Sequence, residues 1–183
     1  MVTNDTQRTF WRSTFDDTYE SYYQKNPLHK DQMHRLAVLG VKREFEFVAN
    51  REGSRRPAAD ISYAFCGGMI LNDRAYGVLY EAVRKECAIY EITIDKNKKR
   101  WLALAISCYD CFDEVQTVGR WHDSGIWLSV DKLYLRENMI GSAKIFRVNT
   151  VGIQWSYMVD DTIYQLINLH KLSGLEFQEI FLS

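Results

Sequence analysis

Residues 72–108 constrain the fold most, because along this segment the hydrophobic pattern changes from the period of a helix to the period of a strand. The asparagine at its start can cap a helix over residues 73–87, in which apolar side chains recur every three or four positions and give one buried face. Residues 89–94 then alternate in period two, residues 95–99 are charged and turn-like, and residues 101–108 are apolar enough for a central strand. The segment therefore predicts a helix that covers a β-hairpin.

The chain before Pro57 carries less regular patterns. Residues 9–23 are rich in aromatic side chains and are compatible with an extended arm or a short helix. In either case the apolar rings must pack against another surface of the protein. Beyond Pro27, the pattern predicts a helix over residues 28–40 and a strand over residues 41–48. The two prolines mark the expected boundaries of this region.

The second half of the chain predicts a run of strands that ends in a helix and a last strand. Strands are expected over residues 125–134 and 144–148, extending a meander, with a turn between them. The pair Asp160-Asp161 suits the start of a helix, Gly174 lies beyond its end, and residues 175–181 alternate as a closing strand.

Helices placed around a run of strands favour an α+β fold over alternating βαβ units. We expect a mainly antiparallel sheet with packed helices in a single domain. Within it, residues 1–57 form an N-terminal arm with a helix and a strand, and residues 58–183 form the α+β core. The length of 183 residues suits one core, because chains of this size usually remain undivided.

Composition excludes several classes of protein. A hydrophobic fraction of 46% is enough to bury a core, so the chain is not disordered. The formal net charge of -1 gives no bulk attraction to nucleic acid or to an anionic membrane. No apolar run approaches the roughly 20 residues of a membrane span, and the first residues lack a secretory signal. We expect a cytoplasmic protein with four free cysteines and with neither nucleic-acid nor membrane partners.

The residues that could carry chemistry are not arranged as a known site. Cys108 and Cys111 have the CxxC spacing, but no second ligand pair accompanies them and they do not open a helix, so neither zinc nor thioredoxin-type redox chemistry is expected. Gly67-Gly68 lacks the spacing of a phosphate-binding loop and indicates a tight bend. The basic run at residues 96–100 is typical of a solvated turn. We therefore expect no cofactor and no metal.

One segment combines residue types suited to binding or to catalysis. Residues 120–127, expected as a loop, contain Trp121, His122, Asp123 and Trp127. Adjacent His, Asp and Ser residues rarely form a catalytic triad, so a small enzyme centred here is the less favoured interpretation. Aromatic residues make up 14% of the chain; tryptophan and tyrosine dominate binding hot spots, although a core rich in rings explains the same number. We take the four named residues as the candidate partner-binding site, with no catalytic residues.

The order of segments from Asp60 to Phe181 resembles a family of bacterial immunity proteins associated with polymorphic toxin systems. The resemblance rests on residues 69–74 at a helix start, residues 101–106 before the acidic segment 111–113, residues 144–148, residues 158–161 at the start of the last helix, and Leu-Ser-Gly-Leu-Glu-Phe at residues 172–177. These are packing motifs, so the resemblance implies a fold and a biological system, and it carries no catalytic residues.

The resemblance implies a cytoplasmic antidote that binds a cognate toxin, encoded nearby, and blocks its active site or holds it inactive. The patch of Trp121, His122, Asp123 and Trp127 is then one expected contact. Two alternatives stay open: a self-associating regulatory module that uses exposed aromatic residues, and a small enzyme that uses the segment from Trp121 to Trp127. A homo-oligomer is compatible with the immunity function.

Overall fold

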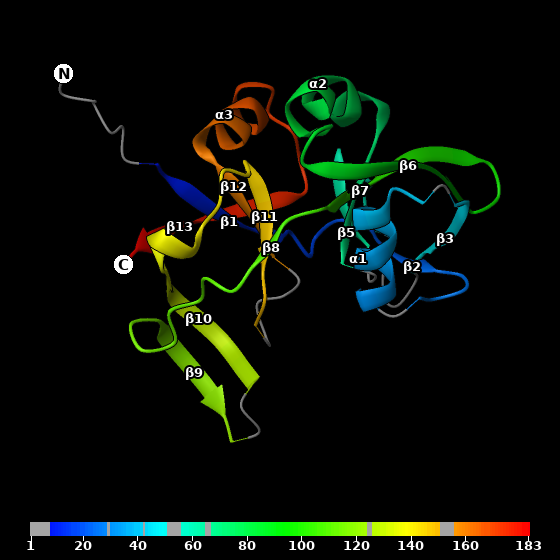
Figure 1. Cartoon of the computed structure of the whole chain (residues 1–183). Coiled ribbons are helices and arrows are strands. Elements are labelled where there is room, and N and C mark those ends of the chain that lie inside the picture. Colours follow the sequence, from blue (N-terminus) through cyan, green and yellow to red (C-terminus); the bar gives the residue numbers. More distant parts are fainter. Residues whose placement is uncertain are drawn as a thin grey trace.

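The computed structural model describes residues 8–28, 30–41, 43–50, 56–64, 67–123, 126–150 and 156–183. Over these residues the chain forms two β-sheets and three α-helices (Figure 1). The helices are α1 (Lys30–Leu39), α2 (Asp73–Val83) and α3 (Asp161–Leu169), and a 3-10 helix, η1, spans Glu137–Met139. In the described part of the chain, no helix is long and apolar enough to cross a membrane.

Six strands close into a small barrel. In order around the barrel they are β2 (Ser21–Gln24), β3 (Phe45–Ala49), β6 (Cys87–Ile94), β7 (Lys98–Ala105), β5 (Gly68–Leu71) and β4 (Ile61–Ala64). Apolar side chains on one face of β6 and β7, among them Ile92 and Leu102, pack with Phe47 of β3 and with Met33 of α1. Helix α1 therefore covers the barrel core with an apolar face; the sequence predicts this helix, over residues 28–40, but not the barrel.

The second sheet has seven strands. Their order is β8 (Cys108–Tyr109), β11 (Ile145–Val148), β12 (Tyr157–Asp160), β1 (Phe10–Phe15), β13 (Leu175–Leu182), β10 (Ile126–Leu135) and β9 (Val118–His122). Strand β1 lies in the middle and pairs antiparallel with both β12 and β13. Residues 9–23, expected as an arm or a short helix, thus supply a strand to each sheet, where Phe10 and Tyr22 are buried.

Both sheets are mixed. Parallel pairs join β10 to β13, β11 to β8, β2 to β4 and β3 to β6. The broad α+β class is therefore confirmed, whereas a mainly antiparallel sheet is not, and the expected meander is wrong because β10 and β11 are not neighbours. Alternation of apolar and polar residues identifies a strand and its buried face, but it does not report the direction of the strand beside it.

Several local elements match the sequence pattern closely. Asn72 and Asp160 each accept a hydrogen bond from the backbone N–H three residues further on, at 2.8 and 3.1 Å, and so cap α2 and α3. Between β6 and β7, Asp95 and Lys96 both have positive φ, as in the tight turns that suit strand twist. Helix α2 ends at Val83, a few residues earlier than expected.

Helices α2 and α3 lie side by side and cover both sheets (Figure 1). Their side chains, Leu79 and Ile163 among them, belong to one core cluster with Leu71 of the barrel and Tyr157 of the seven-stranded sheet. The Tyr157 hydroxyl donates a buried 2.7 Å hydrogen bond to the carbonyl of Gly67, at the bend between β4 and β5. The two sheets therefore share a core and are bonded directly to each other.

The side chain of Asp60 bonds the start of the barrel strand β4 to the segment that follows α3. We call the contacts of this side chain the Asp60 junction. Its carboxylate accepts hydrogen bonds from the Asn72 side chain at 2.8 Å and from the Ser173 N–H and hydroxyl at 3.0 and 3.1 Å, and it pairs with Arg74 at 2.8 Å. Burial alone would raise the pKa of Asp60, but these hydrogen bonds and the Arg74 charge lower it. Gly174 has φ of 103°, and a Cβ there would collide with a β4 carbonyl oxygen, so glycine is required.

We expect Asp60→Asn to lower the free energy of unfolding by about 2 kcal/mol at neutral pH, since hydrogen bonds to a charged group contribute roughly 1.5–3 kcal/mol. Because the pKa of Asp60 is lowered in the folded state, its stabilisation is complete above the unfolded pKa of about 3.9 and is lost as the pH falls through the folded pKa. Urea unfolding of the parent and the variant should therefore differ strongly at pH 7 and weakly at pH 2.

Asp17→Asn is the matched control, because Asp17 is exposed and makes no hydrogen bond to the described residues. It should leave the unfolding curve unchanged. A cost of Asp60→Asn that stays constant from pH 7 to pH 2 would contradict the electrostatic account of the junction.

Candidate functional site

The predicted partner-binding residues lie on the hairpin of β9 and β10, which extends from the edge of the seven-stranded sheet (Figure 1). Trp121 of β9 is opposite Trp127 of β10, and His122 ends β9. Asp123 belongs to the connection, whose residues 124–125 lie outside the described part of the chain. The segment expected as a loop is therefore mostly strand, and the pairing of the strands brings the two tryptophans together.

The two tryptophans have different environments. Trp127 is 5% exposed, belongs to the core cluster of the seven-stranded sheet, and meets Phe112 edge to face with ring centroids 5.8 Å apart. Trp121 is 42% exposed, and its ring centroid lies 4.2 Å from that of Trp127. Trp127 therefore anchors the hairpin to the core and supports Trp121 at the surface.

His122 and Asp123 are exposed at the end of the hairpin. Ser124, the third residue of the catalytic interpretation, lies outside the described residues. A general base usually works inside a concave site that limits access of water, whereas exposed side chains on a protruding element suit contact with another macromolecule. His122 and Asp123 have the exposure that such a contact requires.

Exposed apolar side chains on and beside the hairpin were not identified from the sequence. Leu128 of β10 is 60% exposed, Val118 of β9 is about half exposed, and Val115 lies almost fully exposed in the turn before β9. We call the following residues the hairpin surface: Val115, Val118, Trp121, His122, Asp123 and Leu128. Single exposed apolar residues are ordinary, but several on one protruding element are a feature of interaction sites. Period-two alternation could not reveal them, because it does not show which strand lies at an edge.

Strands β9 and β10 approach each other closely. A Cβ on Gly119 would collide with the carbonyl oxygen of Ser129, so glycine is required at this position. The Arg120 Nε donates to the Ser129 hydroxyl at 3.1 Å, which places the guanidinium on the side of the hairpin opposite Trp121. Two register shifts interrupt the pairing, and bulges of this kind increase the local twist.

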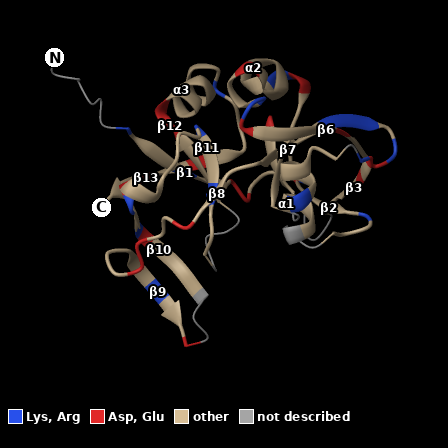
Figure 2. Ribbon diagram, in the orientation of Figure 1, with Lys and Arg blue, Asp and Glu red and all other residues tan. Residues whose placement is uncertain are grey.

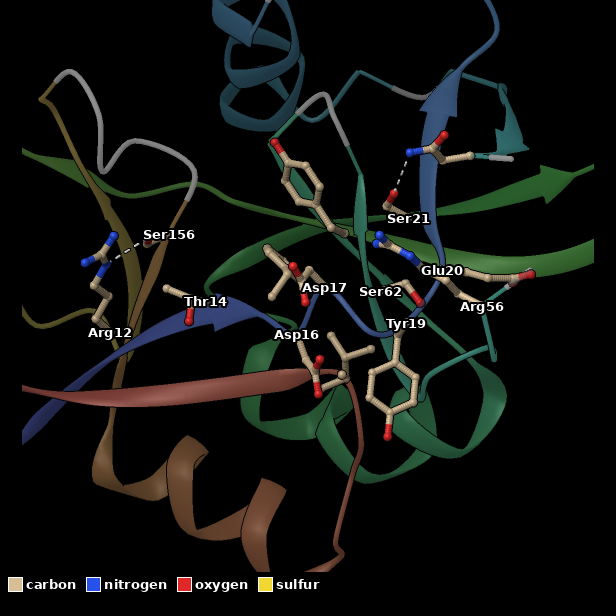
Figure 3. Close-up of a pocket in the computed structure, with 15 residues that line it drawn as sticks. Arg12, Thr14, Asp16, Asp17, Tyr19, Glu20, Ser21, Arg56, Ser62 and Ser156 are labelled. Atoms are coloured by element: carbon tan, nitrogen blue, oxygen red, sulfur yellow. Dashed lines mark hydrogen bonds between the residues drawn. The ribbon is translucent and has the colours of Figure 1, made fainter. Parts of the chain in front are cut away.

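A cleft of about 400 Å³ lies where the link between β1 and β2 passes strand β4. Figure 3 shows Arg12 at one end of the cleft and Arg56 and Glu20 at the other, with Asp16 and Asp17 between them. These residues come from both sides of the junction between the two sheets. Sequence patterns did not identify the cleft, because its residues converge only when β1 and β4 enter different sheets.

Most charged groups in the cleft have partners within the protein. The Thr18 hydroxyl and N–H donate to Asp16 at 2.7 and 2.9 Å and lower the pKa of its carboxyl. Glu20 accepts from a tyrosine hydroxyl at 2.9 Å, and Arg12 donates to the Ser156 hydroxyl at 3.0 Å. Among the described residues, the lining contains no histidine and no cysteine. The hydrogen bonds of Asp16, Glu20 and Arg12 stay within residues 16–22 or run between β1 and the residue before β12, so most charged groups of the cleft are held by neighbours close in the fold.

Two of the three cysteines in the described part of the chain are buried. Cys87 and Cys111 are buried, Cys108 is exposed, and Cys66 lies outside the described residues. Burial raises the pKa of the Cys111 thiol to about 11 and also raises that of Cys87, so both are protonated at neutral pH. Within the described ranges, no group of three or more His, Cys, Asp or Glu side chains is placed to hold a metal ion.

Comparison with protein families decides the class of the molecule. The sequence model of the Immunity protein family (Imm11) matches residues 12–181. The chain belongs to this family. The Imm11 match confirms the resemblance to immunity proteins and extends from β1 to β13, whereas the resemblance seen in the sequence began at Asp60. Immunity families are generally not enzymes. No curated protein matches the chain.

In this Imm11 family member, we expect Trp127→Ala to lower the free energy of unfolding by about 3–5 kcal/mol, because it leaves a cavity in the core. Trp121→Ala should lower it by less than about 1 kcal/mol, as for most surface substitutions. Chemical unfolding followed by far-UV circular dichroism measures both. If the two variants lose similar free energy of unfolding, Trp127 is not the anchor and Trp121 is not merely a surface residue.

Proposed function

We propose that this protein is the antidote to a cognate bacterial toxin encoded nearby, and that it neutralises the toxin in the cytoplasm by direct protein–protein contact. The match to an immunity family over residues 12–181 carries the proposal. The described residues support it, because they contain an exposed hairpin with aromatic and apolar side chains.

The hairpin surface is the proposed contact with the toxin. Trp121 offers a large, rigid ring with a polar N–H, the kind of side chain that dominates binding energy. Leu128 and Val118 add apolar area, and His122 and Asp123 add polar groups at the rim. Trp127 is buried, so its role is to hold Trp121 in place and not to touch the partner.

The protruding shape of the hairpin suggests how neutralisation works. An element that extends from a sheet edge reaches into a concave site more easily than a flat face does (Figure 1). Enzyme active sites are commonly concave. We infer that the hairpin covers or enters a concave region of the toxin and thereby excludes its substrate.

The first experiment is co-expression of the tagged chain with the product of the neighbouring gene. Rescue of growth together with a stable, co-purifying complex supports toxin neutralisation. A neighbouring product that neither harms cells nor binds the chain would refute the proposal.

Self-association is the second candidate, and the exposed Leu128 and Val118 are the observation in its favour. Apolar side chains on a free edge could serve contacts between copies as well as contacts with a toxin. Sedimentation equilibrium over a wide concentration range separates the two. A monomer mass that does not change with concentration would exclude the self-associating module.

We expect Trp121→Ala to weaken toxin binding by about 2 kcal/mol or more, roughly 30-fold, because truncating a central aromatic residue removes contacts that exclude water. The effect should appear mainly as faster dissociation, since interface substitutions change the association rate little. Surface plasmon resonance on the purified complex measures both rates.

Leu169→Ala provides the matched control, because Leu169 is 75% exposed at the end of α3, far from the hairpin in Figure 1. It should bind the toxin like the parent. Equal losses for Leu169→Ala and Trp121→Ala, or no loss for Trp121→Ala, would place the contact elsewhere.

A further inference from the structure

Strand β9 is the last strand of the seven-stranded sheet, and among the described residues it pairs only with β10. Alternate residues of such a strand direct their N–H and C=O groups away from the sheet. At the opposite end of the sheet, β8 is only two residues long, whereas β9 has five. Of the two terminal strands of this sheet, β9 therefore has the longer free edge, and it belongs to the hairpin that carries the exposed Trp121.

The β9 edge lacks most of the features that protect edge strands from pairing. It contains no proline, and its one formally charged residue is Arg120. Figure 1 shows β9 on the outside of the hairpin, with no other element of the described chain across its outer edge. Gly119 keeps β9 close against β10, so the edge is held as a strand. An unprotected edge of this kind is suited to accept one more strand.

The two faces of β9 differ in chemistry. Val118, Arg120 and His122 alternate on one face, where the guanidinium also bonds Ser129, and Trp121 lies on the other. In Figure 2, β9 carries the blue of a basic residue and the end of the hairpin carries the red of an acidic residue. An added strand would therefore meet a cation on one face and an aromatic ring on the other.

We propose that the toxin contributes an extended strand that pairs with the free edge of β9, with a carboxylate opposite Arg120 and an apolar side chain beside Trp121. This inference rests on the proposed toxin-binding function and specifies how the hairpin performs it. Backbone hydrogen bonds would supply attraction that depends little on sequence, and the side chains on the two faces would select the toxin.

A second copy of the chain fits the same edge less well. Two β9 strands that pair antiparallel are related by a two-fold axis near the middle of the strand, which is Arg120. In every register that pairs most residues of the two strands, the two Arg120 side chains lie directly opposite or diagonal to each other. Like charges in these positions oppose pairing, whereas an acidic toxin strand is favoured.

Hydrogen exchange measured by NMR on the labelled full chain, alone and with the toxin, tests the proposal. We expect the amides of alternate β9 residues to exchange on the order of 100-fold more slowly in the complex, since each gains a backbone hydrogen bond. Amides that already face β10 should change little, and backbone NOEs should connect β9 to one toxin strand.

Charge reversal tests the side-chain selection. Arg120→Glu should weaken toxin binding about 10-fold. Lys85→Glu, an equal change at an exposed position just after α2, should weaken it much less, because α2 lies far from the hairpin in Figure 1. A matching acid-to-lysine change in the toxin strand should restore binding to the Arg120→Glu variant.

The outcomes separate this inference from the proposed function. A neutralising complex in which β9 amides exchange as fast as in the free chain would overturn strand addition and leave toxin neutralisation standing. Failure to form any complex or to rescue growth would overturn both. If the β9 amides of the chain alone exchange more slowly as the protein concentration rises, the edge pairs with a second copy. This result would also overturn the proposal.

Discussion

The Asp60 junction is the contact on which the placement of both sheets depends. Asp60 immediately precedes β4 of the barrel, and Ser173 and Gly174 immediately precede β13 of the seven-stranded sheet. The Ile61 N–H also donates to the Ser173 carbonyl at 3.0 Å, so the start of β13 is bonded to the start of β4. Because β13 pairs with both β1 and β10, its position determines where the hairpin leaves the sheet.

Strand β10 has a supported half and an exposed half. Residues Leu133–Leu135 pair with β13 and include two fully buried leucines, whereas the first half of the strand pairs, in the described part of the chain, with β9 alone. Trp127 is the buried aromatic residue that ties this first half to the core. The residues that hold the hairpin and the residues that it displays are therefore different, which lets the surface bind a partner without disturbing the core.

The sequence predicted local structure well and long-range pairing poorly. The cap residues Asn72 and Asp160, the β6–β7 hairpin and the closing strand depend on neighbours within a few residues, so their patterns are visible in sequence. The closed barrel and the parallel partners of β10 and β3 depend on segments far apart in the chain, and no local pattern encodes them. At the candidate site, the residue types of Trp121 and Trp127 stood out, but their opposite burial follows from the cluster around Phe112.

That difference in burial bears on how such a protein would achieve specificity. If an edge strand provided only backbone hydrogen bonds, it would accept almost any extended segment, because the ladder carries little sequence information. Specificity then needs side chains that reject wrong strands as well as side chains that favour the right one. In the proposed pairing, Arg120 on one face and Trp121 on the other would meet this need, since a strand with a cation opposite Arg120 would be repelled and a strand with a polar residue beside Trp121 would lose apolar contact. The buried Trp127 fixes both, because it sets the face of the hairpin that turns toward the core.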